Sequence, residues 1–205
     1  MAAVLPWLMI GDKQAARDRA LLRICNVRYI INVSPPRTEG GVANFFEKEM
    51  CFEYLRLPLK DMNTESVLDH LPRAVEFLQR ARVRADGCVL VHCNEGKSRS
   101  TSIIVGYLIQ SHGLSYEEAL GMVQAVRAQA EPKDAFRRQL ASLEPGILDG
   151  GDGAKVEKRR LEDTEGCSPS KRLAIGPAIG PAIGPTHGPA IGPARGPIGP
   201  DIGPE

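Results

Sequence analysis

A short polar loop between two apolar segments is the feature that most constrains how this chain folds. Residues 87–91 form an apolar run, typical of a strand buried on both faces of a sheet. Residues 102–109 are apolar nearly all round, which indicates a buried helix. Between them lies the sequence His92-Cys93-Asn94-Glu95-Gly96-Lys97-Ser98-Arg99-Ser100. A strand, a tight loop and a helix N-terminus direct several backbone N–H groups at one point, so this loop is suited to hold an anion such as phosphate.

Two residues in this loop can supply chemistry. The N–H groups and helix dipole that favour a bound anion also favour a thiolate over a thiol, so we expect Cys93 to be an ionised nucleophile near neutral pH. Arg99 carries a planar fork that matches two oxygens of a phosphoryl group. Gly96 suits a loop that curls tightly or approaches a ligand closely. The alternative is a structural cysteine beside a surface arginine. It does not explain why the strand, cysteine, glycine, arginine and apolar helix follow one another in the order that an anion site needs.

These residues resemble the signature of the protein tyrosine phosphatase superfamily, which is His-Cys, five residues, then Arg followed by Ser or Thr. The sequence Ser98-Arg99-Ser100, with Gly-Tyr-Leu-Ile at 106–109, is similar to the dual-specificity branch, which usually has Ala-Tyr-Leu-Met there. The family's first strand, second strand and closing helix are matched by residues 5–11, 29–33 and 132–140. Because the first strand begins almost at Met1, the chain resembles the small atypical members, which have no amino-terminal docking domain.

Alternating strand and helix patterns between Leu5 and Gln139 predict an α/β domain with a central, mainly parallel sheet flanked by helices on both faces. The loop is then expected outside the carboxyl end of its strand, where such sheets place ligands. We assign residues 1–144 to this dual-specificity phosphatase catalytic domain.

Phosphate ester hydrolysis also needs an acid that protonates the leaving oxygen. In the family this acid is an aspartate in a loop that follows a strand, upstream of the cysteine. Residues 52–57 are typical of such a strand, and Asp61 follows it, so the resemblance makes Asp61 the general acid. Asp69 is the nearest rival, but it lies at the expected start of the next helix, which directs it away from the site.

The resemblance implies a reaction in two displacements. The Cys93 thiolate attacks phosphorus while Asp61 protonates the departing oxygen; water then attacks the phosphocysteine with Asp61 as base, and Ser100 helps the sulfur to leave. Arg99 binds the phosphate together with the loop residues Asn94, Glu95, Gly96, Lys97 and Ser98. His92 is expected to orient the loop and support the thiolate, although a structural histidine would occupy the same position. No metal or other cofactor is required.

Charge and cysteine content limit the partners and the compartment. The chain holds 26 Lys+Arg against 25 Asp+Glu, and residues 1–144 are similarly balanced, so no basic stripe for nucleic acid is expected. Lys97 is the one local cation that could favour acidic or multiply phosphorylated substrates, unless it is only solvated. Five cysteines without framework spacing favour a reducing compartment. With neither a signal peptide nor an apolar run long enough for a membrane span, we expect a cytoplasmic protein.

Residues 145–205 differ from the rest in composition. They are charged through residue 173 and then repeat Ala-Ile-Gly-Pro and its variants over 174–205, which predicts a disordered tail. Glycine recurs every fourth residue, which excludes collagen. Lys158-Arg159-Arg160 and Lys171-Arg172 weakly resemble a bipartite nuclear import signal, and a merely solvated charged tail is the alternative. Ser168, followed by Pro169, has the form preferred by proline-directed kinases, so the tail could serve as a partner or phosphorylation segment.

The function that these features predict is hydrolysis of phosphotyrosine and of phosphoserine or phosphothreonine in proteins. Two alternatives stay open. Relatives with the same loop act on phosphoinositides or RNA 5′-triphosphates, and others are inactive modules that bind phosphoproteins. Inactive relatives typically lack the cysteine or the arginine, whereas Cys93, Arg99, Ser100 and a plausible acid are all present here.

Overall fold

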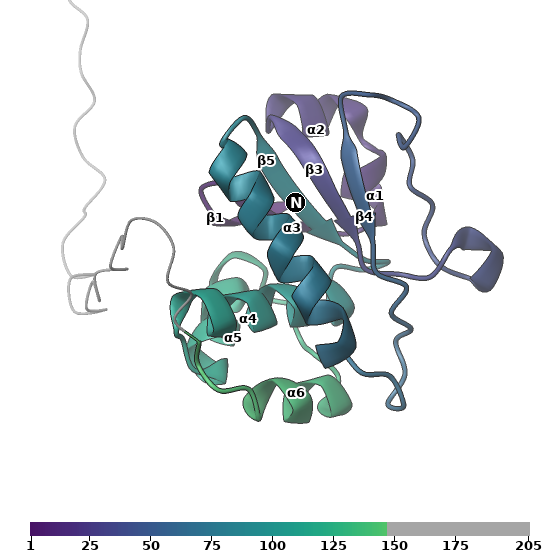
Figure 1. Ribbon diagram of the computed structural model, residues 1–205. Helices are drawn as coiled ribbons and strands as arrows, with labels where there is room; N and C mark the ends of the chain where they lie inside the picture. Colours follow the sequence, from purple (N-terminus) through teal and green to yellow (C-terminus); the bar gives the residue numbers. More distant parts are fainter. Residues whose placement is uncertain (147–205) are drawn as a thin grey trace, which may run out of the picture. The chain divides into compact units, whose positions relative to one another are not determined.

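A five-stranded sheet with the strand order β1-β2-β5-β3-β4 forms the centre of residues 1–146, the part of the chain that the computed structural model describes (Figure 1). The strands are β1 (Ala2–Leu5), β2 (Leu8–Gly11), β3 (Val27–Asn32), β4 (Glu53–Arg56) and β5 (Cys88–His92). Neighbouring strands are parallel except for β1 and β2, which are antiparallel. The predicted α/β fold with a mainly parallel sheet is therefore confirmed.

The start of the chain differs from the single strand predicted over residues 5–11. Residues Pro6 and Trp7 form a turn that joins β1 to β2 as a hairpin, with Leu5 paired to Leu8. Proline has no N–H to donate to a neighbouring strand and its fixed φ suits a turn, which explains why the chain reverses here.

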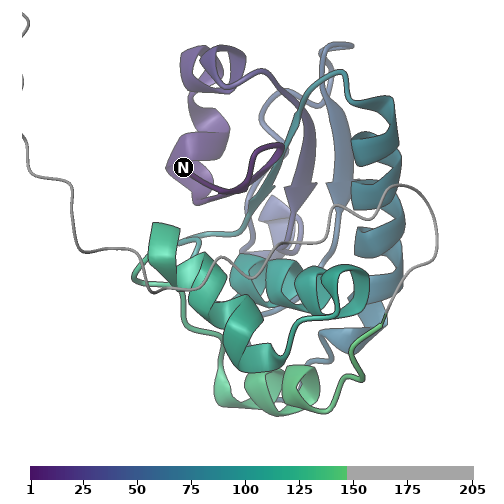
Figure 2. The same cartoon turned by 90° about the vertical axis from the view of Figure 1, so that its left-hand side faces the viewer.

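Helices cover both faces of the sheet. They are α1 (Lys13–Arg17), α2 (Arg19–Ile24), α3 (Leu71–Arg84), α4 (Arg99–His112), α5 (Tyr116–Val126) and α6 (Asp134–Ala141). Figure 2 shows the purple helices α1 and α2 on one side of the sheet and α3 on the other, with the helices α4 to α6 grouped in the lower part of the view. None of the helices within residues 1–146 combines the length and the apolar character that a membrane span requires.

Strand β5 lies in the middle of the sheet and contributes to two separate cores. Val89 and Val91 pack into the larger core with α3 and α4, while Leu90 packs into the smaller core beneath α1 and α2. This burial on both faces explains the uninterrupted apolar run in the sequence. The strand ends at His92, which lies between Gly11 of β2 and Asn32 of β3, so the residues after it emerge at the centre of the sheet's carboxyl edge.

Helix α4 is the most deeply buried helix, because every residue from Ser100 to Ile109 is buried. Its Gly106 permits a close approach to α3: a Cβ added there would lie 2.4 Å from a methyl group of Leu71.

The predictions for the end of the chain, namely the disordered tail, the import signal and the Ser168 phosphorylation segment, lie outside the described residues. The boundary after residue 144 also stays a prediction.

His92 occupies the end of β5 without exposure to solvent. Its Nδ1 lies 3.2 Å from the carbonyl oxygen of Cys93, which can only accept, so Nδ1 carries the proton. Its Nε2 is buried and has no hydrogen-bond partner within residues 1–146. Burial lowers the pKa of His92 to about 4, so the ring is neutral at neutral pH.

We expect Gly106→Val to destabilise the domain by about 1–3 kcal/mol, because the added methyl groups must displace buried Leu71 and Leu140. Gly121→Val on α5 is the matched control: it is also inside a helix, but no atom lies within 4 Å of the added Cβ. We expect the control to change the free energy of unfolding by less than about 0.5 kcal/mol. Chemical unfolding of the two variants tests this, and equal losses would contradict the packing described here.

We expect His92 to make the protein less stable in acid. Its ordinary pKa of 6.5 falls to about 4 on folding, so between these values the unfolded chain binds a proton that the folded chain does not. The free energy of unfolding should therefore fall by about 2 kcal/mol from pH 7 to pH 5 through this group alone. His92→Asn keeps an N–H donor for the Cys93 carbonyl but has no titrating ring. This variant should therefore lack the part of the acid-induced loss of stability that comes from His92. Unfolding curves at both pH values compare the two proteins; an equal loss would show that His92 does not titrate as described.

Candidate active site

The loop after β5 wraps around the sulfur of Cys93. The Gly96 N–H donates to Cys93 Sγ over 3.2 Å, and Ser100 Oγ lies 3.4 Å from the same sulfur. Gly96 has a φ of +65°, the left-handed conformation that a tight curl requires. Cys93 is only 2% exposed, so its sulfur is reached through the opening of the loop rather than from its sides.

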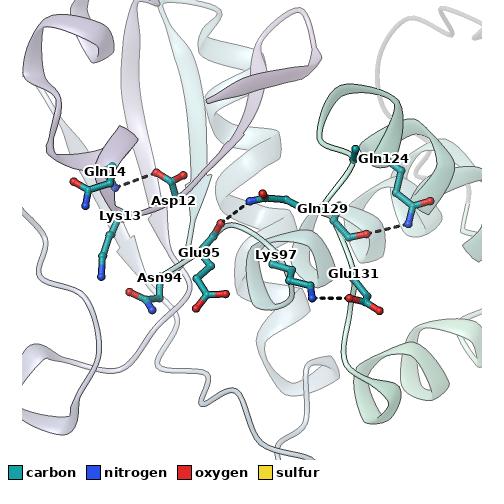
Figure 3. Close-up of a pocket in the computed structure, with 11 residues that line it drawn as sticks. Asp12, Lys13, Gln14, Asn94, Glu95, Lys97, Gln124, Gln129 and Glu131 are labelled. Atoms are coloured by element: carbon teal, nitrogen blue, oxygen red, sulfur yellow. Dashed lines mark hydrogen bonds and ion pairs between the residues drawn. The ribbon is translucent and has the colours of Figure 1, made fainter.

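The loop's carbonyl oxygens are all bound from outside the loop. Residues 94–98 each have a carbonyl that accepts a hydrogen bond from a neighbouring segment or from α4. The donors are the backbone N–H groups of Lys13, Glu131 and Ser102 and the side chains of Thr101, Ser102, Arg127 and Gln129. Figure 3 shows one of these contacts, in which the Gln129 amide reaches the Glu95 carbonyl. Because N–H and C=O of one peptide unit point in opposite directions, this arrangement turns the N–H groups inward, as an anion site requires.

Arg99 is the first residue of α4 and lines the pocket above the loop. Its Nη1 donates weakly to the Leu59 carbonyl over 3.5 Å. Its Nε is buried and has no acceptor within residues 1–146. A buried guanidinium N–H without a protein acceptor is costly, and it fits an arginine whose acceptor is a bound anion.

Asp61 is held at the same pocket by two residues. Ser98 Oγ donates to Asp61 Oδ1 over 3.1 Å, and Lys133 Nζ lies 3.7 Å from that oxygen and donates to the Asp61 carbonyl. Lys133 also donates its backbone N–H to Ser98 Oγ over 3.2 Å. Asp69, the rival acid, is exposed in the 3-10 helix η2 (Leu68–His70) and does not line the pocket. The structure thus brings Asp61, and not Asp69, to the cysteine.

The pocket that contains Cys93, Asp61 and Arg99 has a volume of about 530 Å³. Of the other predicted residues, four line it, namely Asn94, Glu95, Lys97 and Ser98. Ser100 and Gly96 instead contact the sulfur from within the loop, and His92 lies behind Cys93.

Sequence reasoning missed part of the pocket wall. Asn63 and the segment 131–134 also line the pocket, and that segment includes Lys133. Pro132 signals the approach of a helix, but a helix start has the same sequence signature wherever it packs. No local sequence signal indicates that the start of α6 lies over the loop.

The rim of the pocket is not strongly cationic. Lys97 Nζ pairs with Glu131 Oε2 at 2.7 Å, so Lys97 is not a free cation beside the loop (Figure 3). A second pocket of about 650 Å³ is also lined by both residues of this pair. Among residues 1–146, no cluster of three or more His, Cys, Asp or Glu has the arrangement of a metal site.

Comparisons with known proteins agree with this geometry. The family described as "Dual specificity phosphatase, catalytic domain" matches residues 8–145. Dual specificity protein phosphatase 19 of Mus musculus is 35% identical over 158 residues, which cover 77% of this chain and 68% of that protein. The crystal structure of human DUSP28 is similar with a TM-score of 0.61 and 32% identity, covering 68% of this chain and 92% of that chain.

A third similarity is to the human tyrosine phosphatase-like serine/threonine/tyrosine-interacting protein, with a TM-score of 0.63 and 28% identity. It covers 68% of this chain and 92% of that chain. With a family match over most of the described residues and a relative above 30% identity, the resemblance seen in the sequence is confirmed. The chain belongs to the dual specificity phosphatase family and is a protein phosphatase.

Proposed function

We propose that the protein removes phosphate from phosphotyrosine and from phosphoserine or phosphothreonine in proteins, through a phosphocysteine at Cys93. The observation that carries this proposal is one pocket that contains a sulfur bound by a loop N–H, a carboxylate, and an arginine whose buried Nε–H has no acceptor within residues 1–146. These groups are Cys93, Arg99 and Asp61. They match the needs of phosphoryl transfer, which are a nucleophile, a clamp for the equatorial oxygens and an acid for the leaving group.

In the first step the Cys93 thiolate attacks phosphorus, and the bond to the ester oxygen breaks as Asp61 gives that oxygen its proton. The inward N–H groups of the loop and the Arg99 guanidinium bind the three other oxygens. Ser98 donates to Asp61 Oδ1, which leaves Oδ2 to carry the proton. The same loop and the same arginine hold the group before, during and after transfer.

In the second step Asp61 takes a proton from water as the water attacks the phosphocysteine, and the sulfur leaves as a thiolate. Ser100 Oγ is near enough, at 3.4 Å, to donate to the departing sulfur. His92 is neutral, so it supports the thiolate only by fixing the Cys93 backbone through its Nδ1–H, and it does not carry a proton in the reaction.

Charges at the rim favour phosphate monoesters in proteins over lipids or RNA 5′-triphosphates that carry several phosphates. Lys97 is paired with Glu131, and Lys133 is beside Asp61. Glu95 adds further negative charge to the pocket wall, whereas Asp134, which also lines the pocket, is paired with Arg137. A substrate with additional phosphate groups would meet carboxylates here rather than free cations.

An inactive phosphoprotein-binding module is the second candidate, because one structural relative is named as an interacting protein. The complete set of Cys93, Asp61, Arg99 and Ser100 around one pocket favours catalysis. Phosphate release from a panel of phosphopeptides, a phosphoinositide and an RNA 5′-triphosphate separates the candidates. Binding of a phosphopeptide without release from any substrate would support the module.

We expect Cys93→Ser to fold and to bind phosphopeptide, but to lose turnover, because a serine hydroxyl keeps the shape of the loop and is not ionised at neutral pH. Phosphate release should fall below about a thousandth of the wild-type rate. Cys51→Ser, at an exposed cysteine, is the control and should keep its activity. Turnover by Cys93→Ser above that level would remove Cys93 from the role of nucleophile.

We expect Asp61→Asn to slow esters with poor leaving groups by about 10²–10⁴ and esters with good leaving groups far less, because only the former need a proton. The amide still accepts the hydrogen bond from Ser98, so the position of the side chain is retained. Rates for a series of aryl phosphates of rising leaving-group pKa measure the effect. Asp69→Asn is the matched control, and a stronger leaving-group dependence in that variant would make Asp69 the acid.

A further inference from the structure

Arg127, the residue that follows α5, binds the loop from the side opposite the pocket. Its Nε donates to the Gly96 carbonyl over 2.6 Å, and its Nη2 donates to the Glu95 carbonyl over 2.7 Å. The side chain is only 11% exposed; its bond to the Gly96 carbonyl is partly buried, whereas its bond to the Glu95 carbonyl is open to solvent. One guanidinium therefore holds two consecutive peptide units of the loop.

The peptide unit between Glu95 and Gly96 connects Arg127 directly to the sulfur. Its carbonyl accepts from Arg127, and its N–H donates to Cys93 Sγ over 3.2 Å. The next peptide unit has its carbonyl on Arg127 Nε, which turns the Lys97 N–H to the inner side of the loop. A flip of either unit would place a carbonyl oxygen where the phosphate oxygens bind, and it would break a bond to Arg127.

Asp12 fixes the guanidinium in turn. Its Oδ2 lies 3.2 Å from Arg127 Nη2, while its Oδ1 accepts from the N–H groups of Gln14 and Ala15 at the start of α1. Burial acts to raise the pKa of Asp12, but the Ala15 N–H and the Arg127 guanidinium outweigh it and hold the pKa below its ordinary value. The carboxylate is thus charged at neutral pH and held in one orientation.

The packing around Gly96 leaves no room for the loop to relax outward. A Cβ at this position would lie 2.4 Å from the Gly11 carbonyl oxygen and 2.6 Å from Arg127 Nη2. Nearby, the Lys13 N–H donates to the Asn94 carbonyl over 3.1 Å. The end of β2, the start of α1 and Arg127 therefore form one wall against which the loop is held.

We propose that Arg127, oriented by Asp12, is a positioning residue that keeps the loop's N–H groups turned toward the phosphoryl group and so sets the affinity of the site for phosphate. The proposal rests on the loop's role as the phosphate site in the proposed function. Arg127 does not itself line the pocket that holds Cys93. An arginine is suited to this task because its rigid fork spans two carbonyls, whereas a lysine offers a single charged point.

The test compares Arg127→Met, Arg127→Lys and Asp12→Asn with the wild type in the full chain. The control is Arg28→Met, an exposed arginine whose ion pair with Asp86 spans 3.8 Å on the surface. The readouts are kcat and KM for an aryl phosphate, the inhibition constant of inorganic phosphate, and the melting temperature. Kinetic values are taken well below the melting temperature of every variant.

For Arg127→Met we expect kcat/KM to fall and the inhibition constant of phosphate to rise, each by about 10²-fold, since a small displacement of binding groups has that effect. Arg127→Lys should recover part of both losses, Asp12→Asn should show an intermediate loss, and Arg28→Met should show none. If Arg127→Met melts lower but keeps the wild-type kinetic constants and phosphate affinity, Arg127 is merely structural and the proposal is wrong.

Two further outcomes are also decisive. If Arg127→Met does not fold, the phosphate affinities of Arg127→Lys and Asp12→Asn test the proposal instead. Weaker binding would support the proposal, and unchanged affinity in both variants would overturn it. If the wild type hydrolyses no ester, the proposed function fails. Calorimetric titration with inorganic phosphate then tests Arg127 independently, and equal dissociation constants for wild type and Arg127→Met would overturn its positioning role.

Discussion

A loop that offers its backbone N–H groups to a ligand must satisfy its carbonyl groups elsewhere, and the rest of this structure depends on that constraint. Each peptide unit has its donor and acceptor on opposite sides, so five inward N–H groups require five outward acceptors to find partners. Here the start of α1, α4 and the segment between α5 and α6 provide those partners. The proposed phosphate site is therefore a property of four packed segments rather than of one motif.

The parallel sheet brings these segments together around the loop. Strand β5 is central and buried on both faces, so the residues after His92 emerge between the ends of β2 and β3. Helix α4 then begins at the loop, and its buried Thr101 and Ser102 side chains donate to the carbonyls of Lys97 and Ser98. Burial in two cores stabilises the strand, and the loop has the rigidity of the elements that flank it.

Charge at the site is concentrated in few groups. His92 is kept neutral by burial, Lys97 is paired with Glu131, and Asp61 is held between Ser98 and Lys133. Arg99 is the pocket-lining cation with a buried, unpartnered N–H among the described residues. Arg99 thus supplies positive charge at the proposed phosphoryl position, while the surrounding wall is close to balanced. This distribution suits a monoester presented by a protein surface.

The local sequence pattern was sufficient to predict the strand, loop and helix between residues 87 and 112. Their signals come from periodicity and from residues adjacent in sequence. The local pattern placed Asp61 after a strand and Asp69 at a helix start, but it was the resemblance to the family that made Asp61 the predicted acid. Only the tertiary structure showed the hairpin at Pro6, the pairing of Lys97 with Glu131, and the contacts of Lys133 and Arg127 with the site. Those contacts join residues far apart in the chain, and a turn or a lone arginine has the same local sequence whether it faces solvent or the back of a phosphate-binding loop.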